Sequence, residues 1–431
     1  MTEPVNLTKR DVLRLAKDGE VRFVRLVFAD ILGVSKNVTI PASRLAAALD
    51  HQITFDGGSI DGFVRGQELD MLLRPDPTTF AIYPWRTTDG CEARLICDIA
   101  MPDGTPFEGC PRTTLRRAVQ DASAQLGAVK VAAELEFFLF EHTESESGSL
   151  TTSDVASYFD FPANDRGEEA RLAIVAGLEA MGIAVWASHH EHAPGQHEID
   201  LAATDPMNLA DAILTARTVA KHLAARFGLE ATFMPKPLEH EAGSGLHFEF
   251  RLDADEDSLL CAVGGILAHA RALTAICNPT VNSYKRLVAQ WDAPIYAVWS
   301  ERSVDTLVRL PRGPSGALCE VRSPDPSCNP YLALATILAA ANDGITAKTY
   351  AGESIRDSSY TLDARERRER GILTLPKSLR QALDALERDQ TVRAALGDHL
   401  FAAFRDAKLA EYERYRRSVH AWEHRAYLRL Y

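Results

Sequence analysis

The spacing of apolar residues along the chain predicts a mixture of strands and helices. Two β-like runs fill residues 21–40, and another short strand is expected over 91–99. Apolar residues recur at helical spacing in 113–126 and in 205–228, and the second of these starts with an Asp-Pro pair and ends at a glycine. The same periodicity makes the final third, about 327–425, mostly helical.

A segment rich in turn residues, 101–112, divides the chain into two unequal parts. We place a small N-terminal domain at residues 1–108 and a larger domain at residues 109–431. A chain of 431 residues is long enough for two domains with sizeable cores.

Composition narrows the class of protein. The net charge of −13 argues against a nucleic-acid or anionic-membrane partner. The N-terminal residues lack the apolar core of a signal peptide, and the longest apolar run, 259–268, is too short to span a bilayer. Seven cysteines without a C-x-x-C pair suggest reduced thiols. A cytoplasmic globular protein is therefore predicted.

Two acids stand in an otherwise apolar strand, "VAAELEFFLF" (131–140). Side chains alternate between the faces of a strand, so Glu134 and Glu136 share one face. Two carboxylates so placed repel each other and lose hydration, and a bound cation removes both penalties. An edge strand with one hydrated face is the alternative.

Three further segments present acids or histidine in a similar way. "HHEHAPGQHEID" (189–200) offers Glu191 and Glu198, "GSGLHFEFRL" (243–252) offers His247, and "ALCEVRSPDP" (317–326) offers Glu320. One shared site explains this coincidence most simply. Five carboxylates and one imidazole suit Mg²⁺ or Mn²⁺ better than a closed zinc site, and their charge calls for at least two ions.

Arginines lie close in sequence to these acids. Arg286, Arg309 and Arg322 are candidates for binding a carboxylate or a phosphate, although each alone could equally serve an ordinary ion pair. Metal ions together with fixed guanidinium groups are what phosphoryl transfer requires.

Taken together, these blocks resemble the glutamine synthetase family of the bacterial class I type. The matching blocks follow the family's order over nearly the whole chain and include "FDGGSIDGF" (55–63), "ELEFFLF", "HHEHAPGQHEID", "TFMPKP", "GSGLH", "NPTVNSYKRLV" and "EVRSPDPSCNPYLAL". The resemblance implies an α+β fold, in which a small N-terminal β-grasp domain precedes a larger catalytic domain with an antiparallel sheet flanked by helices. It also implies ATP-dependent joining of glutamate to ammonia through γ-glutamyl phosphate.

The resemblance further assigns roles to individual positions. Two or three Mg²⁺ or Mn²⁺ ions per subunit are expected, in two groups of ligands: Glu136, Glu191 and Glu198, and Glu134, His247 and Glu320. The amino-acid substrate would meet Gly243, Arg286 and Arg322. The nucleotide would meet His189 and Arg309. The amine site would use Asp292 and, from a neighbouring subunit, Asp56. Active sites between subunits imply a homo-oligomer, a dodecamer of two hexameric rings.

Several positions depart from the family's pattern. Ala242 replaces an asparagine that helps to hold glutamate, and Asp292 replaces the flap glutamate that takes a proton from the amine. Trp291 adds bulk beside it, and Val304 replaces an arginine. We therefore predict a γ-glutamyl-amine ligase that uses an amine larger than ammonia. Ordinary glutamine synthetase is one alternative, and a member that no longer ligates, whether an amidohydrolase or a regulatory assembly, is the other.

Overall fold

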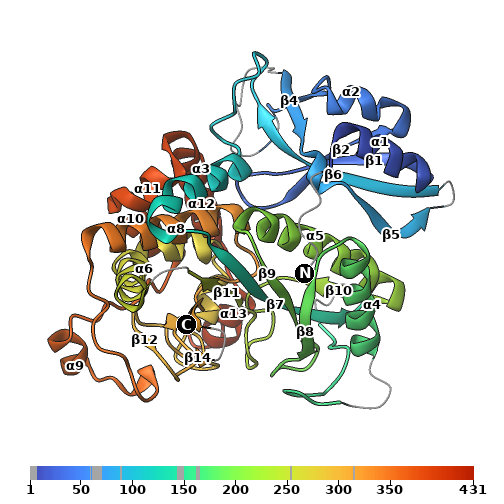
Figure 1. Ribbon diagram of the computed structural model, residues 1–431. Coiled ribbons are helices and arrows are strands. Elements are labelled where there is room, and N and C mark those ends of the chain that lie inside the picture. Colours follow the sequence, from blue (N-terminus) through green and yellow to red (C-terminus); the bar gives the residue numbers. More distant parts are fainter. Residues whose placement is uncertain are drawn as a thin grey trace.

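The computed structural model describes residues 7–58, 60, 70–87, 90–142, 150–161, 166–252, 255–313 and 316–431 (Figure 1). Two sheets organise these residues, one of six strands and one of nine. The smaller sheet belongs to the N-terminal part, drawn in blue in Figure 1, and the larger one lies at the centre of the rest. The mixed fold predicted from the apolar pattern is confirmed.

The N-terminal sheet has the strand order β2-β1-β6-β4-β3, with β5 also paired to β6. Its central pair, β1 and β6, is parallel, whereas the other pairs are antiparallel. Two helices, α1 and α2, accompany it, and side chains such as Leu26 and Leu95 are fully buried in a core of their own. The bounds are α1 Lys9–Asp18, β1 Val21–Ala29, β2 Ser35–Pro41, α2 Leu45–Leu49, β3 Thr54–Asp56, β4 Asp70–Pro75, β5 Ala81–Thr87 and β6 Gly90–Ala100.

The larger sheet has the order β12-β13-β15-β11-β7-β9-β8, with β10 added to β7 and β14 added to β15. The strand that carries Glu134 and Glu136 is β7, which lies between β11 and β9, so the alternative of an edge strand is wrong. The bounds are β7 Lys130–Glu141, β8 Val185–His190, β9 Gln196–Thr204, β10 Leu229–Thr232, β11 Leu246–Arg251, β12 Trp299–Ser300, β13 Val308–Arg309, β14 Arg312–Gly313 and β15 Gly316–Val321.

Helices cover this sheet and form the C-terminal third, as the periodicity predicted. The long helix of 205–228 is α5, which Asp205 caps by accepting the N–H of Asn208 at 3.0 Å, and it ends through a 3₁₀ turn at Gly228 in the left-handed region. The bounds are α3 Pro111–Leu126, α4 Arg166–Ala180, α5 Pro206–Ala224, α6 Glu256–Cys277, α7 Ser283–Arg286, α8 Pro330–Ala347, α9 Ala364–Glu369, α10 Leu379–Arg388, α11 Gln390–Leu396, α12 Asp398–Arg417 and α13 Ala421–Tyr427.

Helix α6 contains the longest apolar run and is long and apolar enough to cross a membrane, but most of that stretch is buried inside the protein. It packs tightly on α8. A Cβ added to Gly265 would lie 2.7 Å from Cα of Gly344, which shows how closely the two backbones approach. Its apolar character is therefore that of a core helix.

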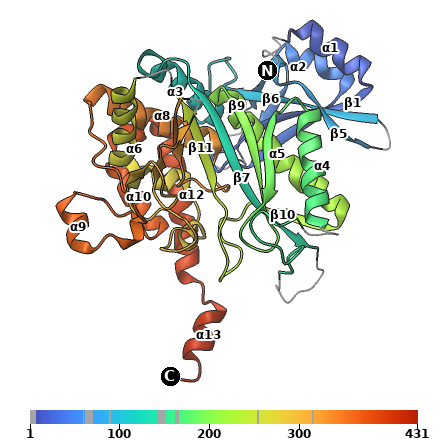
Figure 2. The same ribbon diagram turned by 60° about the horizontal axis from the view of Figure 1, so that its bottom comes forward.

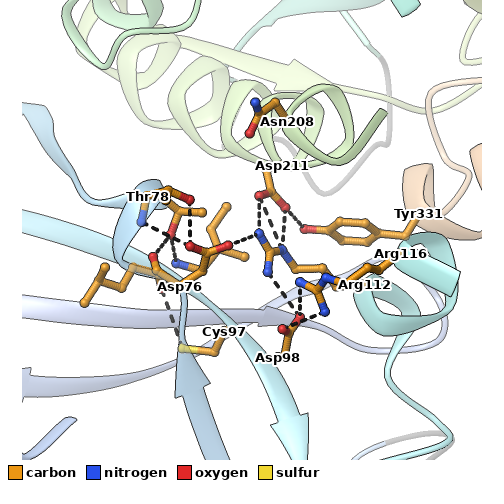
Figure 3. A network of polar contacts seen from close by, with 12 residues as sticks. Asp76, Thr78, Cys97, Asp98, Arg112, Arg116, Asn208, Asp211 and Tyr331 are labelled. Atoms are coloured by element: carbon orange, nitrogen blue, oxygen red, sulfur yellow. Dashed lines mark hydrogen bonds and ion pairs between the residues drawn. The ribbon is translucent and has the colours of Figure 1, made fainter. Parts of the chain in front are cut away.

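A buried arginine joins the N-terminal sheet to the helices (Figure 3). Arg112, at the start of α3, lies 2.8 Å from Asp76 and 3.1 Å from Asp98. Asp76 directly follows β4, and Asp98 belongs to β6, so both are part of the small sheet or next to it. On its other side it is 2.9 Å from Asp211 of α5, which also accepts a hydrogen bond from the hydroxyl of Tyr331 in α8. Three carboxylates around one guanidinium fix the small sheet against the helical layer.

The C-terminal helix α13 extends away from the body of the protein (Figure 2). It and the residues beside it expose large apolar side chains, namely Val419, Trp422, Tyr427, Leu428, Leu430 and Tyr431. The polar run 363–371 forms the short, exposed helix α9 and its end. Most of the predicted loop 142–150 and part of the block 55–63 lie outside the described residues.

Candidate active site

One face of the large sheet is apolar and the other carries the predicted acids. Leu135, Phe137, Leu246 and Phe248 point into the core formed with the helices. The residues between them along β7 and β11 therefore point to the opposite face, as strand alternation requires. A set of carboxylates and an imidazole gathers there because the backbone register aligns them.

The register places predicted residues directly opposite one another. His247 of β11 faces Glu134 of β7, and Glu136 of β7 faces Glu198 of β9. In turn, Glu198 faces His189 of β8. The face that carries the acids therefore extends across four neighbouring strands, β11, β7, β9 and β8.

The ligand atoms of Glu134, His247 and Glu320 all lie within 4.8 Å of one another. Nδ1 of His247 is 2.7 Å from Oε2 of Glu134 and 3.8 Å from Oε1 of Glu320. Burial lowers the pKa of His247 to about 3, and Arg322 acts in the same direction. The imidazole is therefore neutral, which is the form that binds a metal ion.

The second predicted group is more buried. Glu136, Glu191 and Glu198 each have less than a tenth of their surface exposed. Burial raises the pKa of Glu191 to about 8, with the charge of Glu136 as the next cause, and burial with the neighbouring Glu136 raises the pKa of Glu198 well above its usual value. The group therefore lacks enough positive charge of its own to keep its acids ionised.

His189 lies within this group of acids. Its Nε2 is 3.1 Å from Glu198 and its Nδ1 is 3.5 Å from Glu191. Asp200, two residues beyond Glu198 on the same face, completes a cluster in which the ligand atoms of His189, Glu198 and Asp200 lie within 4.8 Å of one another. Asp200 was not among the predicted residues, although the alternation in "HEID" could have indicated it.

The arginines differ in their partners. Arg309 lies 3.2 Å from Glu320, and Arg322 forms an ion pair with the same carboxylate. Among the described residues, the Nε of Arg309 is buried without a hydrogen-bond partner. Two guanidinium groups therefore pair with the single carboxylate of Glu320.

Arg286 is buried in a different way. Its guanidinium donates to the carbonyl oxygens of Ser323, Pro324 and Arg322 at 2.9 to 3.3 Å. In the part of the chain that the structure describes, no carboxylate lies within ion-pair distance of it. A buried guanidinium without a carboxylate partner is well suited to bind the carboxylate of a substrate.

Two glycines allow the backbone to pass close to these side chains. A Cβ on Gly245 would lie 2.7 Å from a guanidinium nitrogen of Arg286 and 3.0 Å from Oε1 of Glu136. A Cβ on Gly243 would lie 3.0 Å from Cγ of Arg286. Gln196, which the sequence reasoning missed, donates to Glu136 at 3.0 Å and to the carbonyl of Gly243 at 3.1 Å. The glycine segment therefore lies between the acids and Arg286.

The flap residues Trp291 and Asp292 are both exposed and both adopt left-handed backbone conformations, with φ of 57° and 56°. This conformation is unfavourable for residues with side chains. The hydroxyl of Tyr360 donates to the carbonyl of Ala293 at 2.7 Å and contacts that of Gln290 at 3.4 Å. Tyr360 therefore holds both sides of the strained turn.

Asp56 lies apart from these residues in the chain. It ends β3 of the N-terminal sheet, is exposed, and accepts the N–H of Gly58 at 2.7 Å.

Two aromatic residues that the sequence did not indicate lie nearer the acids. The ring of Tyr158 stacks on His192 at 4.4 Å, and the ring of Phe159 meets His189 edge-on at 4.6 Å.

The donor set can be tested against a metal. Carboxylate oxygens with one neutral imidazole on a buried face match the ligands that Mg²⁺ and Mn²⁺ bind, and the raised pKa values of Glu191 and Glu198 show that a cation would relieve electrostatic repulsion. The residues present therefore fit divalent ions.

Comparison with known proteins agrees with this geometry. Residues 20–102 match the family model "Glutamine synthetase, beta-Grasp domain", and residues 108–427 match "Glutamine synthetase, catalytic domain". The chain is 45% identical to the glutamine synthetase of Thermus thermophilus over 444 residues, and 43% identical to that of Clostridium saccharobutylicum over 440 residues. In both cases 98% of this chain and 99% of the relative are covered.

Solved structures give the same picture. "GmaS/ADP complex-Conformation 1" superposes with a TM-score of 0.87 at 30% identity, covering 97% of this chain and 99% of that one. Plasmodium falciparum glutamine synthetase superposes with a TM-score of 0.85 at 24% identity, covering 97% and 98%, and this likeness concerns the fold. Members of this family use divalent metals and ATP, and they form oligomers. The chain therefore belongs to the glutamine synthetase family, and it is an ATP-dependent glutamate ligase that forms a carbon–nitrogen bond.

Proposed function

We propose that this ligase joins glutamate to ammonia through a γ-glutamyl phosphate. The observation that carries the proposal is the buried guanidinium of Arg286, which among the described residues has no carboxylate within ion-pair distance and lies across Gly245 from Glu136. Relatives of 43–45% identity named glutamine synthetase favour ammonia over the larger amine predicted from the sequence.

In the first step, an oxygen of the substrate's γ-carboxylate attacks the γ-phosphorus of ATP, and ADP leaves. Arg286 and Arg322 would hold the amino acid, with Gly243 at close approach, and Arg309 would meet the phosphates, with His189 on the nucleotide side. When bound, divalent ions would neutralise charge on the transferred group. Their ligands would be the two proposed groups: Glu136, Glu191 and Glu198, and Glu134, His247 and Glu320. Two or three Mg²⁺ or Mn²⁺ ions per subunit are proposed.

In the second step, the amine nitrogen attacks the acyl carbon and phosphate leaves with the former carboxylate oxygen. Ammonium must lose a proton before it can attack. Asp292 is the proposed base, and Asp56 from a neighbouring subunit would help to form the amine site. Holding the amine and the acyl phosphate together accounts for much of the rate gain expected in such a site.

A larger amine is the second candidate, and one observation favours it. Asp292 is one methylene shorter than glutamate, which shortens its reach by about 1.5 Å. The indole of Trp291 beside it is 48% exposed, and an alkyl or aryl amine could pack on it. Such burial contributes on the order of 1–3 kcal/mol. Ala242 is buried in an apolar cluster with Phe138 and Phe140, and its methyl group, unlike an asparagine amide, cannot donate a hydrogen bond to the acid.

A panel of amines distinguishes the two candidates. Glutamate, ATP and Mg²⁺ or Mn²⁺ are supplied with ammonia or a series of primary amines, and phosphate release and product mass are measured. If ammonia has the highest kcat/KM of the panel, the result supports the glutamine synthetase reaction. A larger amine that ranks first, with Asp292→Glu shifting the ranking back towards ammonia, supports the second candidate. Asp357→Glu, which alters an exposed aspartate elsewhere, is the matched control.

We also propose a cytoplasmic homo-oligomer, a dodecamer of two hexameric rings, with a domain boundary near residue 108. The apolar side chains exposed on and around α13 support this assembly, because a second subunit would bury them. Light scattering tests it: a mass of twelve chains is expected, and an active monomer would exclude it.

A further inference from the structure

Asp154 lies on the loop 150–161 and is an acceptor for several elements at once. Its side chain is 8% exposed. Oδ1 accepts the N–H groups of Gly195 at 2.9 Å and Ala156 at 3.0 Å, and it lies 2.9 Å from Nε2 of His190. Oδ2 accepts the hydroxyl of Ser153 at 2.9 Å. One carboxylate therefore connects its own loop to the turn between β8 and β9.

The loop is itself fixed to β7. The N–H of Glu141 donates to the carbonyl of Thr151 at 2.8 Å, and the N–H of Ser153 donates to that of Leu139 at 3.2 Å. The N–H of Leu139 donates to the carbonyl of Gly195 at 2.8 Å, so the turn also contacts β7 directly. Asp154 thus ties the β8–β9 turn to the strand that carries Glu134 and Glu136.

Two histidines, His190 and His197, lie next to the acids in sequence, and His190 extends the connection that Asp154 makes to the β8–β9 turn. Nδ1 of His190 lies 2.7 Å from the carbonyl of Glu191, and its Nε2 faces Asp154, so both ring nitrogens face acceptors. The ring therefore links the carboxylate of Asp154 to the backbone at Glu191. His190 immediately precedes Glu191, and His197 immediately precedes Glu198, so the pair lies directly behind two proposed metal ligands.

A third metal site does not explain this cluster, although Asp154, His190 and His197 are close enough to suggest one. Arg171 donates to Nδ1 of His197 at 2.8 Å, because a guanidinium can only donate. The proton of the neutral ring is therefore on Nε2, the atom that faces Asp154 at 3.9 Å. A metal ion at Nε2 would require the proton to lie on Nδ1, where it would face the donor group of Arg171, so this cluster is poorly suited to bind a metal.

We propose that Asp154 is a positioning residue that sets Glu191 and Glu198 at the separation from Glu136 that a divalent ion requires. The inference rests on the proposed role of those three acids as ligands of one ion. Residues that orient metal ligands commonly affect affinity by about 10–100-fold when they are removed. The other group, Glu134, His247 and Glu320, lies on β7, β11 and β15, whereas the carboxylate of Asp154 contacts Ser153, Ala156, His190 and Gly195.

The test is Mn²⁺ binding to the metal-stripped full-length protein, measured by calorimetry and by electron paramagnetic resonance of free Mn²⁺. Asp154→Ala is expected to weaken one class of sites by about 10–100-fold and leave the other class unchanged. Asp154→Asn keeps an acceptor for Gly195 and Ala156 but loses the charge, so its affinity is expected to lie between those of Asp154→Ala and the unmutated protein. Asp160→Asn, an exposed aspartate of the same loop that accepts the N–H of Ser157, is the matched control.

A purely structural role would lower the melting temperature without changing Mn²⁺ affinity. The proposal would be overturned if the folded variants bound Mn²⁺ at both classes of sites with the affinity of the unmutated protein. If Asp154→Ala does not fold, the Mn²⁺ affinity of Asp154→Asn decides the question. This experiment measures metal binding and not ligase activity. If every amine in the panel failed to react, the proposed function would be rejected, but the effect of Asp154 on Mn²⁺ affinity could still be interpreted.

Discussion

His247 and Glu134 lie directly opposite each other on β11 and β7, with Nδ1 of the imidazole 2.7 Å from Oε2 of the carboxylate. Backbone pairing fixes this relationship, and the same pairing places Glu136 opposite Glu198. Groups held on paired strands are positioned more precisely than groups held on loops. The acids therefore stay close together even though each raises the energy of the others.

The metal-free protein is expected to lose stability as the pH rises from about 5 to 8. The pKa of Glu191 is about 8 in the fold, compared with 4.5 for the unperturbed group, so the folded state binds more protons than the unfolded state in this range. Stability then falls with pH, with a limiting slope of about 1.4 kcal/mol per pH unit for one proton. Urea unfolding in a chelator at several pH values measures the slope.

Two comparisons make this prediction specific. Glu191→Gln should flatten the slope, because the glutamine side chain does not titrate in this range. Saturating Mn²⁺ should flatten it for the unmutated protein, because the cation stabilises the ionised carboxylates. An equal slope in the chelator for both proteins would show that Glu191 does not cause it.

Arg112→Met is expected to destabilise the protein by about 3–5 kcal/mol, because it leaves the buried carboxylate of Asp211 without its cationic partner. Arg116→Met is the control, since Arg116 is partly exposed and, among the described residues, forms its ion pair with Asp98. The measurement is the free energy of unfolding. Equal losses for the two variants would mean that the junction in Figure 3 contributes no more than a surface ion pair.

His269 should stabilise the helical layer only while it is protonated. It lies 2.7 Å from Asp389 and 3.1 Å from Asp343, and the hydrogen bond to Asp389, helped by that to Asp343, raises the pKa of His269 above 6.5. The contribution of His269 to the free energy of unfolding is complete below about pH 6.5, the pKa of the ring in the unfolded chain. This contribution is lost as the pH rises through the higher pKa that His269 has in the folded protein. His269→Gln should therefore cost more at pH 6 than at pH 9.

The matched control is His142→Gln, because His142 is exposed. A cost of His269→Gln that stays constant from pH 6 to pH 9 would show that the ring acts by packing and not by charge.

Much of the site could be predicted because strand alternation is a local property. The spacing of Glu134 and Glu136 put both on one face, three further segments offered Glu191, Glu198, His247 and Glu320, and the resemblance divided the six residues into two groups of ligands. Their distribution over β7, β8–β9, β11 and β15 is the one the structure has. The helices α3 and α5 were predicted for the same reason, since apolar periodicity and capping residues lie within each segment.

What the sequence could not supply was the order of the strands and the long-range contacts. Nothing in "VAAELEFFLF" indicates which strands lie on either side of β7, because neighbours are decided by segments far along the chain. Gln196 reaches Glu136 over 60 positions, and Asp154 reaches Gly195 over 41. The motif "HHEHAPGQHEID" contains Gln196 but does not indicate its partner, and Asp154 lies outside the matching motifs, so only the folded structure shows which residues the two contact.

Transfer of oxygen from glutamate to phosphate tests the central claim most directly. Glutamate labelled with ¹⁸O in its γ-carboxylate is incubated with ATP, Mg²⁺ and the best amine of the panel, and the released phosphate is analysed by mass spectrometry. An acyl-phosphate route predicts one ¹⁸O atom in each phosphate released with product, because the bridging oxygen comes from the carboxylate. Amide product accompanied by unlabelled phosphate would contradict the account.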